Sequence, residues 1–212
     1  NVIGPDSHFG KYDLRDGFWS VGVHPRSRHH LMVRHPATGQ LLRCTSLPFG
    51  YSLSPQHFCA VTEAVSGLFR QRVAGLGIHC FTFVDDFLVV GDSHEATATG
   101  MRMLEELLGE LGLPWAPHKQ RGPARAIEFL GVLLVNTPEH QCFALTQGRQ
   151  ERVVALVEAW LGRRPVAAGE AVVADPRELA SLIGQLGFCA DVVPNGRTYL
   201  QGMVRQFGGL TV

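Results

Sequence analysis

The pattern of apolar and polar positions changes character several times along the 212-residue chain. Aromatic and β-branched residues recur at near-alternating positions over 9–23, and short runs at 31–33 and 41–45 flank a PATG turn, which together predict a small antiparallel unit. From Ser54 the spacing becomes helical, with Ser54 as the expected N-cap, and this helix ends near Gly75. The first third of the chain is therefore expected to form strands followed by one long helix.

Two apolar runs, IHCFTFV and FLVV, flank Asp85 and Asp86 in segment 78–90. Their length and β-branched content favour a hairpin over a helix. A helix with an acidic outer face is expected to open at Ser93. A second hairpin then follows over 127–145, in which the turn NTPE joins IEFLGVLLV to QCFAL.

Three helical patterns occupy the remainder of the chain, at about 147–161, from Asp175 onward, and at about 195–207. In the first, Val153, Leu156, Val157 and Trp160 are the expected buried positions. The stretch 164–174 is rich in Ala, Gly and Pro and is the best candidate for a linker. Strands, helix, hairpin, helix, hairpin and then helices alone predict an α+β fold with a helical C-terminal section.

Composition narrows the protein class. Hydrophobic residues make up 45% of the chain and charged residues 18%, which excludes a disordered or collagen-like chain. We find no apolar run long enough to cross a membrane and no signal-peptide pattern, so we expect an intracellular protein of the cytoplasm or nucleus, neither secreted nor membrane-bound. The five cysteines have no CxxC spacing and are expected to be reduced core residues, without a structural zinc site.

Net charge is zero, but the charges are unevenly placed. No acidic residue lies between Gly17 and Thr62, and a second basic cluster spans 118–125. Each cluster is compatible with an ordinary solvated loop or with contacts to nucleic-acid phosphates. The arginines concerned are Arg26, Arg28, Arg34, Arg43, Arg121 and Arg125.

Acidic residues provide the strongest chemical signal. Asp85 and Asp86 alone are typical of a turn, but Asp13 also lies in a strand-like context, KYDLRDGFW. Carboxylates about 4 Å apart repel by about 4 kcal/mol at an effective dielectric constant of 20. If the three side chains meet, a divalent metal is the natural counter-ion, and oxygen-only ligands favour magnesium.

Five short motifs, in order, resemble the palm of a retroelement reverse transcriptase, of the gypsy-like and especially the DIRS-like kind. They are KYDLRDGFW, LPFGYSLSPQHF, FVDD, the lysine at 119, and FLGVLL. The resemblance implies a right-hand polymerase palm with an antiparallel sheet and flanking helices. It divides the chain into a palm with a remnant of fingers at 1–145 and a helical thumb-like or connection-like segment at 146–212, with most of the fingers absent.

The same resemblance implies an RNA-directed DNA polymerase that adds deoxynucleotides to a primer 3′-end with two Mg²⁺ ions, or Mn²⁺ in their place. Asp13, Asp85 and Asp86 would be the catalytic metal ligands, helped by the backbone carbonyl of Leu14. Lys119 would donate a proton to the leaving pyrophosphate, and contact with phosphate is its alternative role. Lys11 and Lys119 are the only lysines in the chain.

The nucleotide pocket would be formed by residues of two motifs. Asp16 and Gly17 would offer backbone amides to the triphosphate, and Phe18 would exclude a 2′-hydroxyl. Phe49 and Gly50 would border the base or template. The alternatives are an ordinary core phenylalanine at 18 and a helix entry shaped only by packing.

The FLG motif would grip the primer terminus through Phe129, Leu130 and Gly131, although these positions also suit a core. Expected partners are an RNA or DNA template with its primer, deoxynucleoside triphosphates and the rest of a retroelement polyprotein. Arg197 would be a further phosphate contact. The competing hypothesis is an inactive or co-opted fragment that keeps the fold and at most binds nucleic acid.

Overall fold

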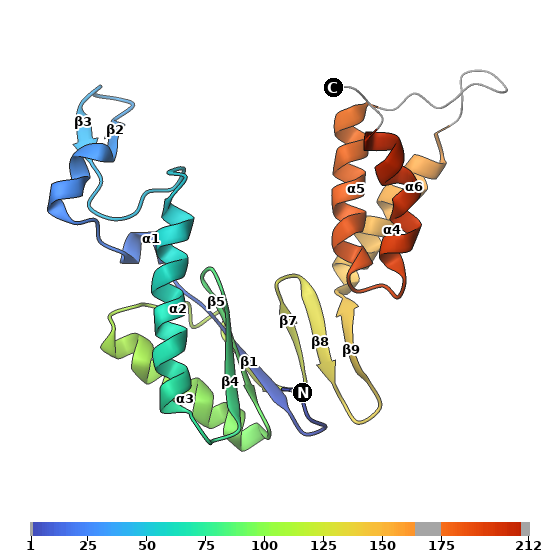
Figure 1. The fold of residues 1–212 in the computed structure, drawn as a ribbon, viewed down its shortest axis with the longest axis horizontal. Coiled ribbons are helices and arrows are strands. Elements are labelled where there is room, and N and C mark those ends of the chain that lie inside the picture. The colour runs from blue at the N-terminus through green and yellow to red at the C-terminus, as the bar shows by residue number, and fades with distance from the viewer. Residues whose placement is uncertain (1, 164–174, 209–212) are drawn as a thin grey trace. The chain divides into compact units, whose positions relative to one another are not determined.

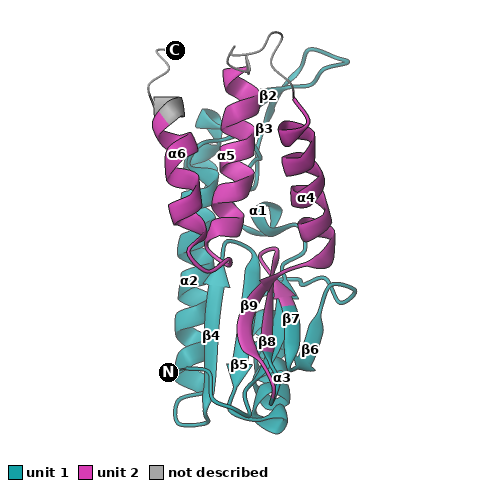
Figure 2. Ribbon diagram, turned by 90° about the vertical axis from the view of Figure 1, so that its right-hand side faces the viewer, with its two compact units in different colours: residues 1–127, 136–138 teal, residues 128–135, 139–212 magenta. Residues whose placement is uncertain are grey.

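The computed structural model describes residues 2–163 and 175–208. Contacts between Cα atoms divide the chain into two compact units, which Figure 2 distinguishes by colour. The first contains Asn1–Ile127 and Asn136–Pro138, and the second contains Glu128–Val135 and Glu139–Val212. Each unit is described by itself, and the functional boundary expected after residue 145 stays a prediction.

A four-stranded antiparallel sheet is the centre of the first unit (Figure 1). Its strand order is β4-β5-β1-β6, so the N-terminal strand lies between the β4–β5 hairpin and an edge strand. Helices α2 and α3 contact the sheet and each other. The elements are β1 (His8–Asp13), α2 (Ser54–Arg72), β4 (Ile78–Phe83), β5 (Asp86–Gly91), α3 (His94–Glu110) and β6 (Arg121–Ala124).

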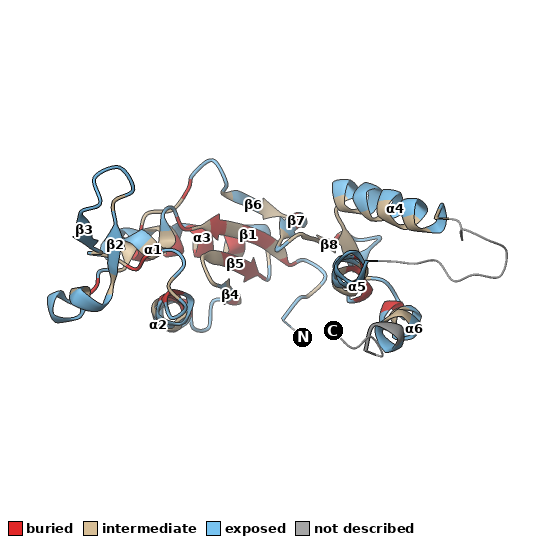
Figure 3. Cartoon of the chain, turned by 90° about the horizontal axis from the view of Figure 1, so that it is seen from above, coloured by how far each residue is buried: buried red, intermediate tan, exposed pale blue. Residues whose placement is uncertain are grey.

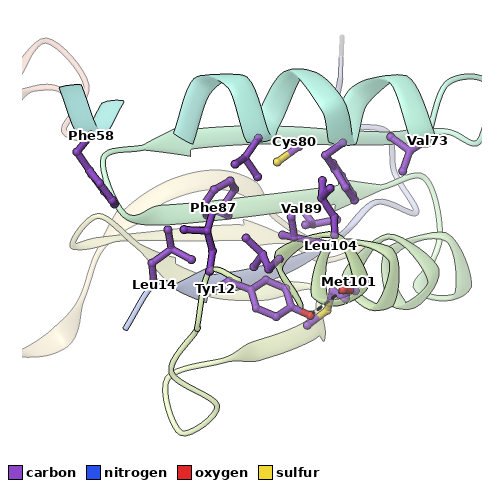
Figure 4. Close-up of a cluster of buried hydrophobic side chains, with 14 of the residues drawn as sticks. Tyr12, Leu14, Phe58, Val73, Cys80, Phe87, Val89, Met101 and Leu104 are labelled. Atoms are coloured by element: carbon purple, nitrogen blue, oxygen red, sulfur yellow. Dashed lines mark hydrogen bonds between the residues drawn. The ribbon is translucent and has the colours of Figure 1, made fainter. Parts of the chain in front are cut away.

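The hydrophobic core of the first unit lies between this sheet and the two helices. Figure 3 shows buried residues concentrated on β1 and β5, the two inner strands. Tyr12 and Phe87 are fully buried and belong to the same cluster as Phe58 of α2 and Leu104 of α3 (Figure 4). Packing of this cluster therefore fixes the position of β1 relative to both helices.

The strand expected over 9–23 is wrong beyond Asp13. A short helix, α1 (Gly17–Ser20), and a 3-10 helix, Pro25–His30, follow instead. The chain turns because Asp16 adopts a left-handed conformation, with φ 56°. The small antiparallel pair expected from the runs at 31–33 and 41–45 is present as β2 (Met32–Arg34) and β3 (Leu41–Arg43).

Strand β6 was not predicted, because its sequence RGPA contains both Gly and Pro. Its place at the edge of the sheet explains the exception, since an edge strand tolerates a residue that cannot donate a backbone hydrogen bond. Its partner is β1, with Lys11 paired with Arg121 and Phe9 with Ala124.

Of the two serines expected at helix N-termini, one prediction is confirmed and one is wrong. Ser93 is the N-cap of α3, and its hydroxyl accepts a hydrogen bond from the Ala96 amide at 3.1 Å, as expected. The N-cap assigned to Ser54 is wrong, because Leu53 occupies that position. The buried Ser54 hydroxyl donates to the Pro48 carbonyl at 2.7 Å instead, which anchors the loop before the helix.

The hairpin expected over 127–145, most of which belongs to the second unit, has three strands, in the order β7-β8-β9. The run IEFLGVLLV bends at Leu130 and Gly131, which both have positive φ and separate β7 from β8. The elements are β7 (Ala126–Phe129), β8 (Val132–Asn136), β9 (Gln141–Leu145), α4 (Gln147–Leu161), α5 (Pro176–Ala190) and α6 (Gly196–Gly208).

The three helices of the second unit lie close to their predicted positions. Asp175 is the N-cap of α5, and its carboxylate accepts a hydrogen bond from the Arg177 amide at 2.8 Å. The expected linker at 164–174 lies outside the described residues. The four apolar positions predicted to be buried in α4 are only half-buried in this structure: Val153, Leu156, Val157 and Trp160.

The described part of the chain contains no helix long and apolar enough to span a membrane. All five cysteines lie within the described residues and are free thiols. Cys80 and Cys189 are buried as expected of core residues, but the expectation is wrong for Cys142, which is exposed, and Cys44 and Cys59 are only half-buried.

Gly91 provides a test of the contact between β5 and α3. A Cβ atom at this position would lie 2.5 Å from the Thr97 amide nitrogen, which is helix backbone and cannot move aside. We expect Gly91→Ala to lower the free energy of unfolding by about 2–4 kcal/mol. Gly67→Ala, in open space on α2, is the control and should raise it by about 0.5–1 kcal/mol. Urea denaturation of both variants measures the difference, and equal stability would contradict the packing described.

Candidate active site

Asp13 lies next to Asp85 and Asp86, which are distant from it in sequence, at one end of the sheet of the first unit. Asp13 is the last residue of β1, and Asp86 is the first residue of β5. The two are direct register partners in the antiparallel β1–β5 pair. Because such partners are about 5 Å apart at Cα, the aspartates predicted to meet are brought together by the backbone itself.

The tip of the β4–β5 hairpin consists of Val84 and Asp85, since Phe83 and Asp86 still pair with each other. Val84 has φ 54°, a left-handed conformation that is costly for a β-branched residue. The Leu14 amide donates to the Asp85 carbonyl at 3.0 Å. This bond ties the end of β1 to the hairpin tip, so Asp85 is also held beside Asp13.

Lys119 forms an ion pair with Asp13. Its ammonium nitrogen lies 2.9 Å from Oδ1 and 3.0 Å from Oδ2 of the carboxylate. The hydrogen bond to Asp13 is the main reason that the pKa of Lys119 is raised, and the charges of Asp13, Asp85 and Asp86 raise it further. The sequence placed Lys119 in the site, and the structure places it on one of the predicted metal ligands.

Negative charge from its neighbours acts on the Asp86 carboxyl. Its pKa is raised, first by burial and then by the negative charges of Asp85 and Asp13, while Lys11 and Lys119 oppose the shift. The site therefore has more negative charge than its two lysines neutralise.

The donor set suits a hard divalent cation. Carboxylate oxygens are the preferred ligands of Mg²⁺, and the Lys119 ammonium already occupies the position of a counter-charge on Asp13. The described residues nevertheless contain no group of three or more His, Cys, Asp or Glu side chains arranged to hold a metal ion. The metal-ligand roles of Asp13, Leu14, Asp85 and Asp86 therefore stay predictions.

The aromatic residues assigned to the nucleotide pocket are in contact. Phe18, in α1, lies 5.0 Å from Phe49 and 5.1 Å from Phe58 between ring centroids. Phe49 is 66% exposed, whereas Phe58 is fully buried. Phe18 therefore contacts both a core residue, Phe58, and an exposed ring, Phe49. This position is compatible with the expected role in the nucleotide pocket and with the alternative of an ordinary core phenylalanine.

The backbone around this cluster is unusual at the predicted positions. Asp16 and Gly50 both have positive φ, and Asp16 makes no side-chain cap to α1. A Cβ atom at Gly17 would lie 2.8 Å from the Phe58 ring, so only glycine allows α1 to approach α2 this closely.

Trp19 is a candidate that sequence reasoning missed. Its ring is half exposed and lies 5.9 Å from Phe49. It extends the exposed aromatic surface that begins with Phe18 and Phe49. Its position directly after Phe18 in the motif was the available signal.

Most arginines predicted to contact phosphates also support the fold. Arg28 donates to the Val23 carbonyl and Arg34 to the Gly39 carbonyl. Arg121 donates to two neighbouring carbonyls, those of residues 118 and 120. Arg125 pairs with Asp6 at 3.0 Å. Arg26 lies in the 3-10 helix and Arg43 in β3, and Arg197 of the second unit pairs with Asp191 at 2.7 Å. The phosphate contacts stay predictions.

The FLG motif forms a tight hairpin turn in the second unit. Phe129 ends β7, and Leu130 and Gly131 have φ values of 51° and 77°. Two consecutive left-handed residues are typical of a two-residue hairpin loop. The turn predicted for this motif is therefore present, and its role as a primer grip stays a prediction.

Comparison with known proteins identifies relatives along most of the chain. Residues 3–134 match the family model described as reverse transcriptase (RNA-dependent DNA polymerase). The Gag-Pol polyprotein of gibbon ape leukemia virus is 27% identical over 187 residues, covering 86% of this chain and 10% of its own length. The Gag-Pol polyprotein of baboon endogenous virus (strain M7) is 26% identical over 199 residues, which cover 92% of this chain and 10% of that polyprotein. The chain thus spans about a tenth of these relatives.

Solved structures provide an independent comparison of the fold. A foamy viral protease-reverse transcriptase in complex with double-stranded DNA matches with a TM-score of 0.73 and 18% identity, over 99% of this chain and 32% of that chain. A foamy viral protease-reverse transcriptase in complex with an RNA/DNA hybrid matches with the same TM-score and identity, over 99% of this chain and 25% of that chain. The likeness confirms the fold that the motifs predicted, and the gypsy-like or DIRS-like subtype stays a prediction.

The raised pKa of Asp86 generates a stability prediction. A carboxyl whose pKa is higher in the folded state lowers stability as pH rises from the unfolded to the folded value. In metal-free buffer at pH 7, Asp86→Asn should therefore raise the free energy of unfolding by about 0.5 kcal/mol, a value reduced for solvent screening. At pH 3 the gain should vanish.

Asp92→Asn, an exposed position just after β5, is the matched control and should change stability little at either pH. Chemical denaturation at the two pH values measures the effect. A destabilised Asp86→Asn at pH 7 would contradict the charge balance described for the site.

Proposed function

Because the chain belongs to the reverse transcriptase (RNA-dependent DNA polymerase) family, we propose that it adds deoxynucleotides to a primer 3′-end by a two-metal mechanism. The observation that carries this proposal is the register of β1 with β5, which sets Asp13 opposite Asp86 and beside Asp85. A cluster of carboxylates at a strand end and a hairpin tip costs stability and has no structural benefit of its own.

Reverse transcriptases generally use divalent metal ions. In this chain Asp13, Asp85 and Asp86, with the Leu14 carbonyl, would hold two Mg²⁺ ions, or Mn²⁺. When bound, such ions lower the pKa of the primer hydroxyl and stabilise charge on the leaving pyrophosphate. The fixed backbone of the β1–β5 pair would keep the carboxylates in place, so little reorganisation is needed during the reaction.

Lys119 is suited to hold a proton near the leaving group. Its contact with Asp13 raises the pKa of its ammonium, which therefore stays protonated at neutral pH. An ammonium can give up its proton, whereas a guanidinium cannot, and this difference supports a chemical reason for lysine at position 119 in a chain whose only other lysine is Lys11. We assign Lys119 the role of proton donor to pyrophosphate.

Phe18 would select the sugar of the incoming nucleotide. It follows Asp13 by five residues and is held on one side by the buried Phe58 ring. A ring fixed in this way leaves no room for a 2′-hydroxyl above it. Asp16 and Gly17 would offer amides to the triphosphate, and Phe49 and Gly50 would border the base.

Partners follow from the same assignment. The foamy viral neighbours are described in complex with double-stranded DNA and with an RNA/DNA hybrid, and two relatives are Gag-Pol polyproteins. We propose that this chain takes an RNA or DNA template with its primer, and that it works as part of a retroelement polyprotein. The segment between Gly17 and Thr62, which lacks acidic residues, would contact phosphates through Arg26 and Arg43.

A second candidate function is nucleic-acid binding without turnover, as in a co-opted element copy. The observation that favours it is the Asp13–Lys119 pair, which occupies a ligand carboxylate, together with the lack of a gathered metal site among the described side chains. This candidate predicts a gel shift with primer-template and no extension under any divalent cation.

Replacement of Asp85 tests the polymerase assignment. Loss of one ligand removes several kcal/mol of transition-state stabilisation, or at least about a thousandfold in rate. We therefore expect Asp85→Asn to abolish Mg²⁺-dependent primer extension on an RNA template while leaving folding intact. Asp92→Asn is the control and should extend like the parent chain. Equal extension by Asp85→Asn would contradict the proposal, and no extension by the parent would favour the second candidate.

Replacement of Phe18 tests sugar selection. Truncation to alanine opens space beside the ring position, so Phe18→Ala should increase ribonucleotide incorporation relative to deoxynucleotide incorporation by at least about tenfold. Single-nucleotide extension with each sugar measures the ratio of kcat/KM values. Phe143→Ala, an exposed phenylalanine of β9, is the control. An unchanged ratio in an active Phe18→Ala variant would assign Phe18 to the core alone.

A further inference from the structure

Consecutive residues of β1 face opposite sides of the sheet. Asp13 pairs with Lys119, whereas Tyr12 is fully buried in the core against α3, as Figure 4 shows. The segment after α3 repeats this alternation: Lys119 reaches Asp13, and the next residue, Gln120, reaches Tyr12. A second contact between the same two segments therefore lies directly behind the Asp13–Lys119 pair.

This second contact is a closed hydrogen-bond network. The Tyr12 hydroxyl donates to Oε1 of Glu105, on α3, at 2.7 Å. Gln120 Nε2 donates both to the Tyr12 hydroxyl at 3.0 Å and to Glu105 Oε1 at 2.7 Å. The Met101 carbonyl lies 3.1 Å from the same hydroxyl. Burial raises the pKa of Tyr12 far above its ordinary value, so the hydroxyl keeps its proton.

The segment that carries Lys119 depends on such a contact for its position. Between α3 and β6 it makes an isolated bridge from Trp115 to Leu14. It then turns through two backbone hydrogen bonds, in which the Ala116 amide donates to the Asp13 carbonyl and the Lys119 amide donates to the Ala116 carbonyl. The Lys119 side chain itself is about half exposed. A long exposed side chain gains little from a surface ion pair, so the position of its backbone decides whether it reaches Asp13.

We propose that Tyr12, Glu105 and Gln120 are positioning residues that lock the 116–120 turn against β1 and α3 and so hold Lys119 on Asp13. The inference rests on the proposed function for its catalytic meaning, but the mechanical claim stands on the network alone. The Tyr12 side chain is fully buried, and Glu105 and Gln120 are half-buried. Withdrawing these polar groups from water costs free energy, and apolar residues of similar size would pack the same space without that cost. The hydrogen bonds among Tyr12, Glu105 and Gln120 are directional, so they fix the orientation of the 116–120 turn.

The two lysines of the chain make the mechanical claim measurable. Labelling with ¹³C,¹⁵N-lysine provides two side-chain signals, one for Lys119 and one for Lys11 as an internal reference. The Asp13→Asn variant gives the chemical shift of the Lys119 side chain when the ion pair is lost. In Tyr12→Phe and in Gln120→Leu, at constant pH, the Lys119 signal should move at least half of the way toward that position.

Controls separate positioning from general damage. Tyr199→Phe removes an exposed hydroxyl on α6 and should move neither lysine signal. Circular dichroism and urea denaturation establish that each variant is folded. If Gln120→Leu does not fold, Glu105→Leu, which removes the acceptor of both hydrogen bonds, makes the same test. An unmoved Lys119 signal in folded Tyr12→Phe and in a folded variant at Gln120 or Glu105 would overturn the proposal.

Primer extension supplies a second, separate readout. Displacement of Lys119 should lower kcat by about tenfold in Tyr12→Phe, with a smaller change in the KM for deoxynucleotide. A loss confined to KM would contradict the positioning role. If the parent chain extends no primer, the proposed function fails, and the lysine signals still decide whether the network holds Lys119.

Discussion

The structure depends on the close approach of like charges at one end of a sheet. Antiparallel pairing of β1 with β5 sets Asp13 opposite Asp86, and the bond from Leu14 to Asp85 adds the third carboxylate. Core packing supplies the free energy that holds this arrangement, since Tyr12 and Phe87, the neighbours of two of these aspartates, are fully buried. The fold thus keeps negative charge concentrated where a chain selected for stability alone would disperse it.

Charge compensation within the site is incomplete. Lys119 neutralises Asp13 through two short contacts, while the pKa of Asp86 stays raised by its neighbours and by burial. The chain alone therefore reaches a compromise in which one carboxylate is satisfied and another is strained. A divalent cation would relieve the remaining repulsion, which links the electrostatics of the three aspartates to the chemistry proposed for them.

The sequence predicted those features that depend on local pattern or on a short motif. The hairpin around Asp85, the capping of α3 by Ser93 and the fold class were all correct. It failed where tertiary contacts override local preference, as at Gly17, which turns helical because α1 packs against Phe58. It also missed the role of Gln120, because nothing in its local sequence reveals a partner on α3. Hydrophobic periodicity predicts helices and strands, but it does not predict polar contacts between side chains that are distant in sequence.

The left-handed valine at the hairpin tip has a consequence for how this chain can vary. Holding Val84 at φ 54° costs about 1–2 kcal/mol that a glycine would not incur. Glycine would also loosen the two-residue loop and let the adjacent carboxyl sample many directions. A β-branched side chain thus exchanges thermodynamic stability for angular precision at Asp85. Substitutions at position 84 that make the protein more heat-resistant are therefore expected to hold the Asp85 carboxyl less precisely.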